Sequence, residues 1–315
     1  MCNVLCCGKW RISRLKYRMI MDNKRLLKRL VTILTAFFAV FCLTSSAFAG
    51  DNDFRLSRLC VGATGCGGGD ANSPAIKNFK QLSKNYAAVM APGHFQPAST
   101  LGEEGFEIAA ESKISFAMDK HASYGAVNKN QKELADGLHI DYDKKYAAPD
   151  VLATTGLHMR KGLPFSFEVE GAFSWLTNSE LFYVDAGIRW AFTEGWWFMP
   201  DISARADVGV LLGSADMSMI NVNADVALSY TWGLGGIAAI TPYAGYKFLT
   251  TFASSRPLLV QNGNETNESV FGRVTLYQHR AFAGVEIQGD YFIFGVEGEF
   301  GADIMSAGAK VGARF

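Results

Sequence analysis

Charged side chains of both signs recur at alternate positions along several stretches of this chain, and the chemistry that they suggest is ion pairing. "FEVEG" places Glu168 and Glu170 two residues apart, and "VDAGIR" places Asp185 four residues before Arg189. Residues two or four apart lie on the same face of a β-strand. A face that mixes acids with bases can pair its own charges. The predicted charge network consists of Glu168, Glu170, Asp185, Arg189, Arg205, Asp207, Glu297 and Glu299.

The same alternation places more charges on this face. A selective pore more often carries one dominant sign at its constriction, so the mixture favours an interior closed by ion pairs. The additional residues expected there are Glu107, Glu111, Lys113, His158, Arg160, Asp225, Lys247, Arg280, Glu286, Lys310 and Arg314.

Histidines are the first candidates for acid–base catalysis, and the chain has five: His94, His121, His139, His158 and His279. Three of them fall in the N-terminal region or the first long loop, and the facing of His279 is ambiguous. His158 is expected to point inward beside Arg160, a cation that does not prepare a histidine to act as a base. The chain has no Gly-x-Ser-x-Gly signature. The sequence therefore predicts a protein without enzymatic activity, and a lipid-modifying hydrolase remains an alternative.

No stretch has the spacing of a metal or cofactor site. "HIDYD" (His139–Asp143) lacks both the twelve-residue calcium spacing and a paired-histidine zinc pattern. The Gly-rich "GATGCGGGD" lacks the Lys-Ser/Thr of a phosphate-binding loop. We therefore expect no metal site and no cofactor.

Residues 1–49 have the layout of a secretory signal peptide. Asp22–Arg29 is basic, Leu30–Leu43 is apolar, and small residues lead to Ala49. A single transmembrane anchor is the alternative, and Met21 makes residues 1–20 a candidate for a mis-called start. Cleavage would remove nine basic residues and one acid, which leaves 21 basic and 29 acidic residues. This acidic balance argues against a nucleic-acid partner.

The segment after the signal is predicted as a flexible Gly-rich leader, residues 50–75. Cys60 and Cys66 are the only cysteines after residue 49, and export favours a disulfide between them over two free thiols. A short helix and linker, residues 76–104, follow. Phe79, Leu82 and Tyr86 recur at helical spacing, and Pro92 ends the pattern. This helix either lies against the remaining protein or plugs it.

From residue 105 to residue 315 the hydrophobic period changes to two. About ten strands are predicted (range 8–12), most near the ~9–11 residues that cross a bilayer at a tilt. In hydrocarbon every backbone group must be paired, so spanning strands have to form a closed barrel. The predicted fold is thus an all-β membrane protein, an antiparallel up-and-down transmembrane β-barrel with a short N-terminal helix. The expected strands are Gly105–Ala117, Pro149–Arg160, Leu163–Trp175, Glu180–Phe192, Asp201–Leu212, Met217–Trp232, Gly236–Thr250, Val270–Gln288, Tyr291–Phe300 and Ser306–Phe315.

Two independent features agree with a membrane barrel. The long connections, Met118–Ala148 and Ala253–Ser269, follow the first and seventh predicted strands, so both fall on one end of the barrel. Aromatic residues gather at strand ends, as an interfacial belt requires: Trp175, Trp190, Phe192, Trp196, Trp197, Tyr230 and Trp232. Periodicity alone does not separate inside from outside, so a secreted soluble β protein stays open as an alternative.

"ITPYAGYKF" (Ile240–Phe248) and the terminal "GAKVGARF" resemble strands of small Gram-negative outer-membrane barrels of the OmpA and OmpW type. The resemblance is one of pattern and covers residues 105–315. It implies that Val311, Ala313 and Phe315 form the signal read by the barrel assembly machinery. It also implies location in the bacterial outer membrane, with outer-membrane lipids as partners.

The expected function is that of a non-enzymatic barrel acting as a scaffold or displaying loops. The reason is that a barrel of this size leaves little room beyond its own side chains. A channel or transporter for small or hydrophobic solutes is the main alternative.

Overall fold

The computed structural model describes residues 74–117, 151–196, 199–235, 237–256 and 271–315, together with Asn52 and Leu56. Several sequence predictions lie outside these residues: the signal peptide, the Cys60–Cys66 disulfide, Trp197 and most of the two long connections. In the described part of the chain, no helix is both long enough and apolar enough to cross a bilayer.

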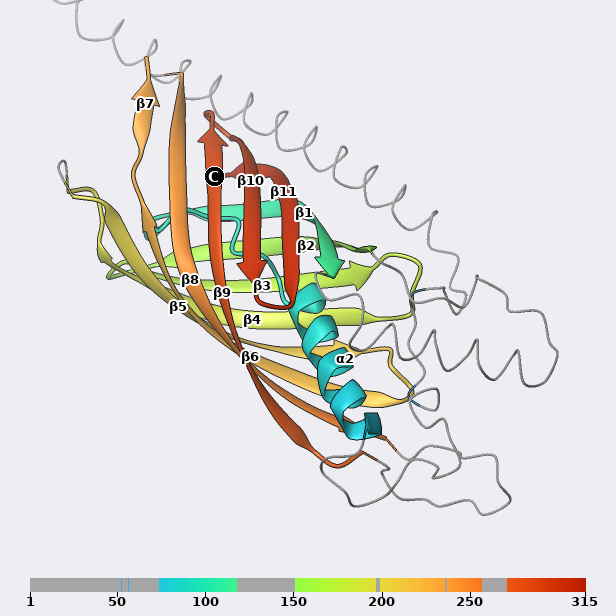
Figure 1. Ribbon diagram of the computed structural model, residues 1–315. Coiled ribbons are helices and arrows are strands. Elements are labelled where there is room, and N and C mark those ends of the chain that lie inside the picture. The colour runs from blue at the N-terminus through green and yellow to red at the C-terminus, as the bar shows by residue number, and fades with distance from the viewer. Residues whose placement is uncertain are drawn as a thin grey trace, which may run out of the picture. The chain divides into compact units, whose positions relative to one another are not determined.

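Ten antiparallel strands form a closed barrel (Figure 1). Each strand pairs with its neighbour in sequence, and β1 pairs with β11 to close the wall. The short β7 (Trp232–Leu234) only extends the edge of β8, so β6 pairs directly with β8. The predicted barrel of about ten strands is therefore confirmed. The barrel strands are β1 (Phe106–Ala117), β2 (Val151–Leu163), β3 (Phe167–Leu176), β4 (Phe182–Thr193), β5 (Asp201–Leu212), β6 (Met217–Ser229), β8 (Ala238–Ser255), β9 (Val274–Gln288), β10 (Phe292–Gly301) and β11 (Ile304–Arg314).

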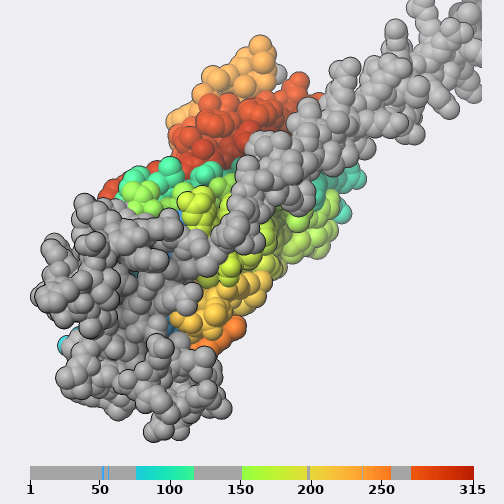
Figure 2. Space-filling model, turned by 90° about the vertical axis from the view of Figure 1, so that its right-hand side faces the viewer, coloured from blue at the N-terminus to red at the C-terminus, as the bar shows by residue number. Residues whose placement is uncertain are grey.

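The closing seam between the first and last strands is a continuous antiparallel ladder from Glu107↔Arg314 to Ala117↔Ile304. Beyond the ladder, Phe106 and Phe315 exchange two backbone hydrogen bonds, with N–H···O distances of 2.9 and 2.8 Å. Figure 2 shows the C-terminal strands beside β1 and β2 on the outer surface. The two edges of the sheet are thus paired with each other.

Side chains alternate across the wall, with apolar residues outside and charged residues inside. Val208 on β5 is 50% exposed, whereas Asp207 beside it is 4% exposed. On β4, Ile188 is 48% exposed and Arg189 is fully buried. A soluble barrel would bury the apolar set and expose the charged one, so the facing is that of a barrel made for a hydrocarbon surrounding.

The two ends of the barrel differ in their connections. At one end, which we call the terminal end, lie Phe106 and Phe315 and the short connections of residues 164–166 and 289–291. At the other, the loop end, lie the short turns of residues 177–181, 213–216 and 302–303 and the strand ends that the two long connections join. The β5–β6 turn at the loop end needs glycine, since Gly213 has φ +84° and a Cβ there would lie 1.9 Å from the Glu180 carbonyl oxygen.

Exposed aromatic rings gather at the terminal end. Trp190 and Phe192 end β4 and meet edge to face, with ring centroids 4.5 Å apart. Tyr230 and Trp232, with centroids 5.5 Å apart, follow β6. Amphipathic rings prefer the headgroup level of a bilayer, so this end has the composition of a membrane interface.

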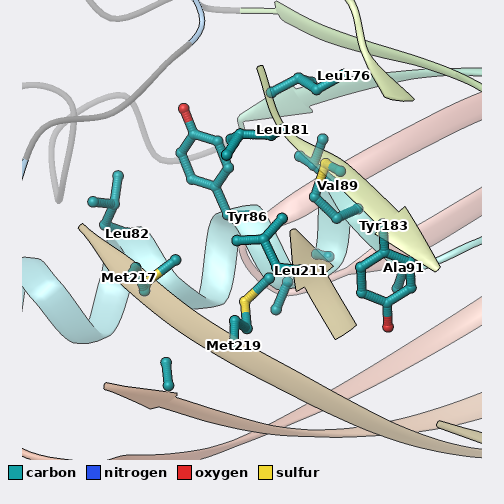
Figure 3. Close-up of a cluster of buried hydrophobic side chains, with 14 of the residues drawn as sticks. Leu82, Tyr86, Val89, Ala91, Leu176, Leu181, Tyr183, Leu211, Met217 and Met219 are labelled. Atoms are coloured by element: carbon teal, nitrogen blue, oxygen red, sulfur yellow. The ribbon is translucent and has the colours of Figure 1, made fainter. Parts of the chain in front are cut away.

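Helix α2 (Pro74–Met90) lies inside the barrel at the loop end, in contact with β2, β3, β6, β8, β9 and β11. It begins inside the range 50–75 that was predicted as the leader, because Pro74 fits a first helical turn. Its face of Leu82, Tyr86 and Val89 packs against wall residues (Figure 3). The wall residues of this cluster include Leu176, Leu181, Tyr183, Leu211, Met217 and Met219. Of the two predicted positions for the helix, the plug is the one found.

Candidate functional site

The interior of the barrel is the candidate site, and it is filled by charged wall residues and by a segment that we call the plug. The plug comprises α2 and the following residues Ala91–Leu101, which have no regular secondary structure. Four long cationic side chains inside the wall, Arg160, Arg189, Lys247 and Lys310, are each less than 2% exposed. Buried charges of this kind persist only when they are paired or hydrogen-bonded.

A first cluster ties the closing seam together near the terminal end. Glu107 of β1 contacts Arg160 Nη2 at 2.5 Å, Lys310 Nζ at 3.1 Å and Arg314 Nη2 at 2.7 Å. Glu286 of β9 contacts the same Lys310 at 2.9 Å and Arg314 at 2.7 Å. Two carboxylates therefore share two cations of β11, and the shared contacts link four strands at the seam.

A second cluster contains most of the predicted network on β3, β4 and β5. Glu168 is 3.4 Å from Arg189, and Glu170 is 3.1 Å from Arg205. Arg205 is also 3.6 Å from Asp207. These three pairs bring together five residues that the sequence placed on one face.

Asp225 of β6 completes the second cluster, with Oδ2 2.7 Å from Arg205 Nε. Asp185 points into the same interior but takes part in none of the ion pairs found among the described residues. Its neighbours across the ladders are Ala172 and Gly209, which offer no cation.

A third cluster surrounds Glu299 of β10, which is 3.1 Å from Lys247 Nζ and 2.9 Å from Arg280 Nε. Glu297, two residues before it, makes no ion pair among the described residues and binds the plug instead. The two glutamates that the sequence grouped together thus have different partners.

His158 does not have the neighbour expected from the sequence. Its Nδ1 is 3.0 Å from Glu111 and its Nε2 is 3.7 Å from Glu170, so it lies between two carboxylates. Arg160 turns to Glu107 and Glu168. The expectation that Arg160 governs His158 is therefore wrong, because cross-strand neighbours decide the contacts more than residues two apart on one strand.

His279, whose facing the sequence left ambiguous, lies on the outer surface. Its Nδ1 is hydrogen-bonded to the hydroxyl of Tyr246, and its ring lies 5.1 Å from that of Phe248. Within the described residues, no group of three or more His, Cys, Asp or Glu side chains is arranged to hold a metal ion.

The end of α2 is bound by two lysines of the wall. The Nζ of Lys113 donates to the carbonyl oxygens of Ala88, at 3.2 Å, and Ala91. The Nζ of Lys247 donates to the Pro92 carbonyl oxygen at 3.0 Å. The last carbonyls of a helix lack partners within it and carry partial negative charge, so buried cations stabilise this end.

Glu297 fixes the next turn of the plug. Its carboxylate accepts the backbone N–H groups of His94 at 2.8 Å and Phe95 at 2.6 Å, and the Tyr243 hydroxyl at 3.0 Å. Phe95 has φ +46°, a left-handed conformation that a bulky residue rarely adopts. The two hydrogen bonds hold the backbone in this conformation.

After this turn, toward the terminal end, the plug is hydrogen-bonded to several strands of the wall. Arg189 donates to the Pro97 carbonyl oxygen at 2.9 Å, and Gln96 donates to Glu170 at 2.8 Å. The Ala98 N–H donates to Ser229 at 2.9 Å. At the terminal end, the Thr100 N–H donates to Glu194 at 2.7 Å and the Leu101 N–H to Glu168 at 2.5 Å.

His94 was not recognised from the sequence as part of the interior. It is fully buried, stacks on Phe282 with centroids 4.4 Å apart, and has Nδ1 3.2 Å from Asp225. The plug has neither strand nor helical periodicity after Met90. The only signal in the sequence was the density of turn residues in "APGHFQPAS".

The residues predicted as an assembly signal lie on the outer side of β11. Val311 pairs with Ala110 and Ala313 with Ile108, at the seam. Phe315 is 48% exposed, and its ring centroid lies 6.4 Å from that of Tyr291. The terminal carbonyl and N–H of Phe315 are both bonded to Phe106.

No protein-family model matches the chain, and no curated protein matches it in sequence. Among solved structures, the N-terminal β-barrel domain of Pseudomonas aeruginosa OprF is 14% identical, covering 68% of this chain and 99% of that one, with a TM-score of 0.26. Ail, the attachment invasion locus protein of Yersinia pestis, is 13% identical over 68% and 99%, with a TM-score of 0.25. The Acinetobacter baumannii outer membrane protein Omp33 is 9% identical over 69% and 100%, with a TM-score of 0.26.

These similarities concern the type of fold and say nothing of what this chain binds. The closed wall, the apolar outer face and the paired interior are features of this structure itself. In fold, the chain is a closed ten-stranded antiparallel β-barrel with an apolar outer face, filled by its own residues Pro74–Leu101.

Proposed function

We propose that the protein is an integral β-barrel of the bacterial outer membrane, without enzymatic activity, that serves as a closed scaffold for the segments at its loop end. The supporting observation is the way the plug is held. Backbone groups of the plug are bonded to side chains of β1, β3, β4, β6, β8 and β10, all around the wall.

The filled interior disfavours the channel alternative. A solute would have to displace a plug whose N–H and C=O groups are bonded to buried charges. Each such charged hydrogen bond contributes about 1.5–3 kcal/mol. Because several would break together, spontaneous opening of a conducting path is rare.

Conductance across planar bilayers tests the closed scaffold. We expect no ohmic current steps from the purified full-length protein, either in KCl or in salts of larger ions. Insertion is verified in parallel by co-flotation with liposomes, and a reconstituted general porin serves as the conducting control. Regular ohmic steps from inserted wild-type protein would favour the channel instead.

Location is tested separately, by fractionation of cells and by migration on detergent gels with and without heating. We expect the chain in the outer-membrane fraction, with a faster-migrating folded form that disappears on boiling. A chain that stays monodisperse in buffer without detergent would contradict the membrane assignment, because the outer face is apolar.

A further inference from the structure

We infer that the chain enters the barrel from the loop end, so that Asn52 and Leu56, which precede α2, lie on the cell surface. This inference rests on the proposed function for its orientation in the membrane. Within the barrel, however, it depends only on the contacts of the plug and of Asn52 and Leu56.

The plug crosses the interior in one direction. At its start, Phe79 stacks on Phe271 with centroids 4.8 Å apart. Phe271 lies in the long connection at the loop end. At its finish, Thr100 is bonded to Glu194, in the connection between β4 and β5 at the terminal end. Next along the chain, the Gly105 carbonyl oxygen accepts a hydrogen bond from the Gly162 N–H at 3.0 Å, immediately before β1 begins.

Two described residues before α2 lie on the loop-end turns. The Asn52 N–H donates to the Asn178 carbonyl oxygen at 3.1 Å, in the β3–β4 turn. The Leu56 N–H donates to Asp216 Oδ2 at 2.8 Å, in the β5–β6 turn.

The helix itself adds a third contact to these two. The Tyr86 hydroxyl donates to the Asn52 carbonyl oxygen at 2.8 Å. Asn52 therefore lies at the loop-end turns beside the last part of α2, at the end of the barrel opposite to Phe106, where β1 begins.

The topology of the barrel then determines on which side of the membrane Asn52 and Leu56 lie. A closed wall has no gap for the chain, so a segment that begins at the loop end and continues into β1 at the terminal end must run through the interior. In outer-membrane barrels the short turns face the periplasm and the long connections face outward. Both long connections here join strand ends at the loop end, and no connection at the terminal end is longer than eight residues, so Asn52 and Leu56 lie outside the cell.

Epitope insertions in the full-length chain test this placement. One tag follows Asn52, a second follows Ser214 in the β5–β6 turn as the loop-end reference, and a third follows Gly235 in the β7–β8 turn as the terminal-end reference. Antibody binding is compared between intact and permeabilised cells. Only variants with a heat-modifiable folded band are scored. We expect at least tenfold more binding to the Asn52 and Ser214 tags than to the Gly235 tag in intact cells, and equal binding after permeabilisation.

The outcomes separate the inference from the proposed function. If the Ser214 tag is exposed and the Asn52 tag behaves like the Gly235 tag, the inference is wrong and the barrel proposal stands. If the Gly235 tag alone is exposed, the orientation of the barrel is reversed, and the placement of Asn52 on the cell surface is refuted.

A smaller change guards against tags that prevent folding. Asn52→Cys in a Cys60→Ser, Cys66→Ser background is treated with a membrane-impermeant maleimide. Labelling in intact cells supports the inference, and labelling only after lysis overturns it.

Discussion

The buried lysine of β8 provides the sharpest test of how the plug is held. Lys247 is fully buried, with Nζ 3.1 Å from Glu299 and 3.0 Å from the Pro92 carbonyl oxygen. Lys247→Met keeps most of the side-chain volume and removes the charge. Of the ion pairs that Glu299 makes with described residues, the one with Arg280 then remains, and the Pro92 carbonyl loses the hydrogen bond from Lys247.

The expected loss follows from these contacts. Removing one partner of a buried ion pair costs about 3–5 kcal/mol. Because Arg280 still compensates Glu299, we expect the lower figure, about 3 kcal/mol, which lowers the folded-to-unfolded ratio about 150-fold. With a urea dependence of about 1–3 kcal/mol per molar, the unfolding midpoint moves down by about 1–3 M.

The matched control is Lys84→Met. Lys84 pairs with Asp303 at 3.8 Å, and both side chains are about 30% exposed. An exposed pair contributes about 0–1 kcal/mol, so this variant should unfold close to the wild-type midpoint. Urea unfolding in detergent micelles, followed by tryptophan fluorescence, measures both.

A double variant checks the cause. Lys247→Met with Glu299→Gln removes both partners of the ion pair, so the double variant should lose less stability than the sum of the losses of the two single variants. If Lys247→Met costs under 1 kcal/mol, or if the two changes simply add, the buried pair does not hold the plug as described.

Three further predictions concern the inner wall, the outer wall and the terminus. Gly308→Ala should lower the unfolding midpoint in urea by an amount equivalent to about 1–3 kcal/mol, because its Cβ would lie 2.4 Å from the Phe95 ring. Gly295→Ala, with 3.7 Å to its nearest atom, should change little, and equal effects would contradict the close fit of the plug. Val208→Arg on the outer face of β5 should cost about 2–4 kcal/mol in lipid vesicles, against about 0–1 for Leu212→Arg at the strand end. A soluble barrel would show no such dependence on depth. Phe315→Ala should reduce the heat-modifiable fraction in cells severalfold while the refolded protein keeps its unfolding midpoint, whereas Phe292→Ala, of similar exposure, should assemble normally. Equal assembly of the two would refute the terminal signal.

The strands and their facing could be predicted because few structures besides a β-sheet with one apolar face produce so long an alternation. On β4, Phe182, Val184 and Ile188 face outward and Asp185 and Arg189 face inward, as the period of two requires. Local sequence decides this pattern. The choice between inside and outside is not local, because it depends on which solvent surrounds the closed wall.

The course and contacts of the plug could not be predicted. The backbone bonds of His94 and Phe95 to Glu297 join residues about 200 apart, and no period marks them. The contacts of His158 were predicted wrongly for a similar reason. They come from the stagger between neighbouring strands, which a single sequence does not display.

The β1–β11 seam has a consequence for how this protein tolerates premature stop codons. The first strand pairs with β2 along one edge, but its other edge has a partner only after the last residues have been synthesised, because Glu107 pairs with Arg314. A message cut before Ile304 would yield a sheet with two open edges, which is a template for aggregation. Even a late nonsense mutation should therefore remove the folded product altogether and leave no shortened barrel.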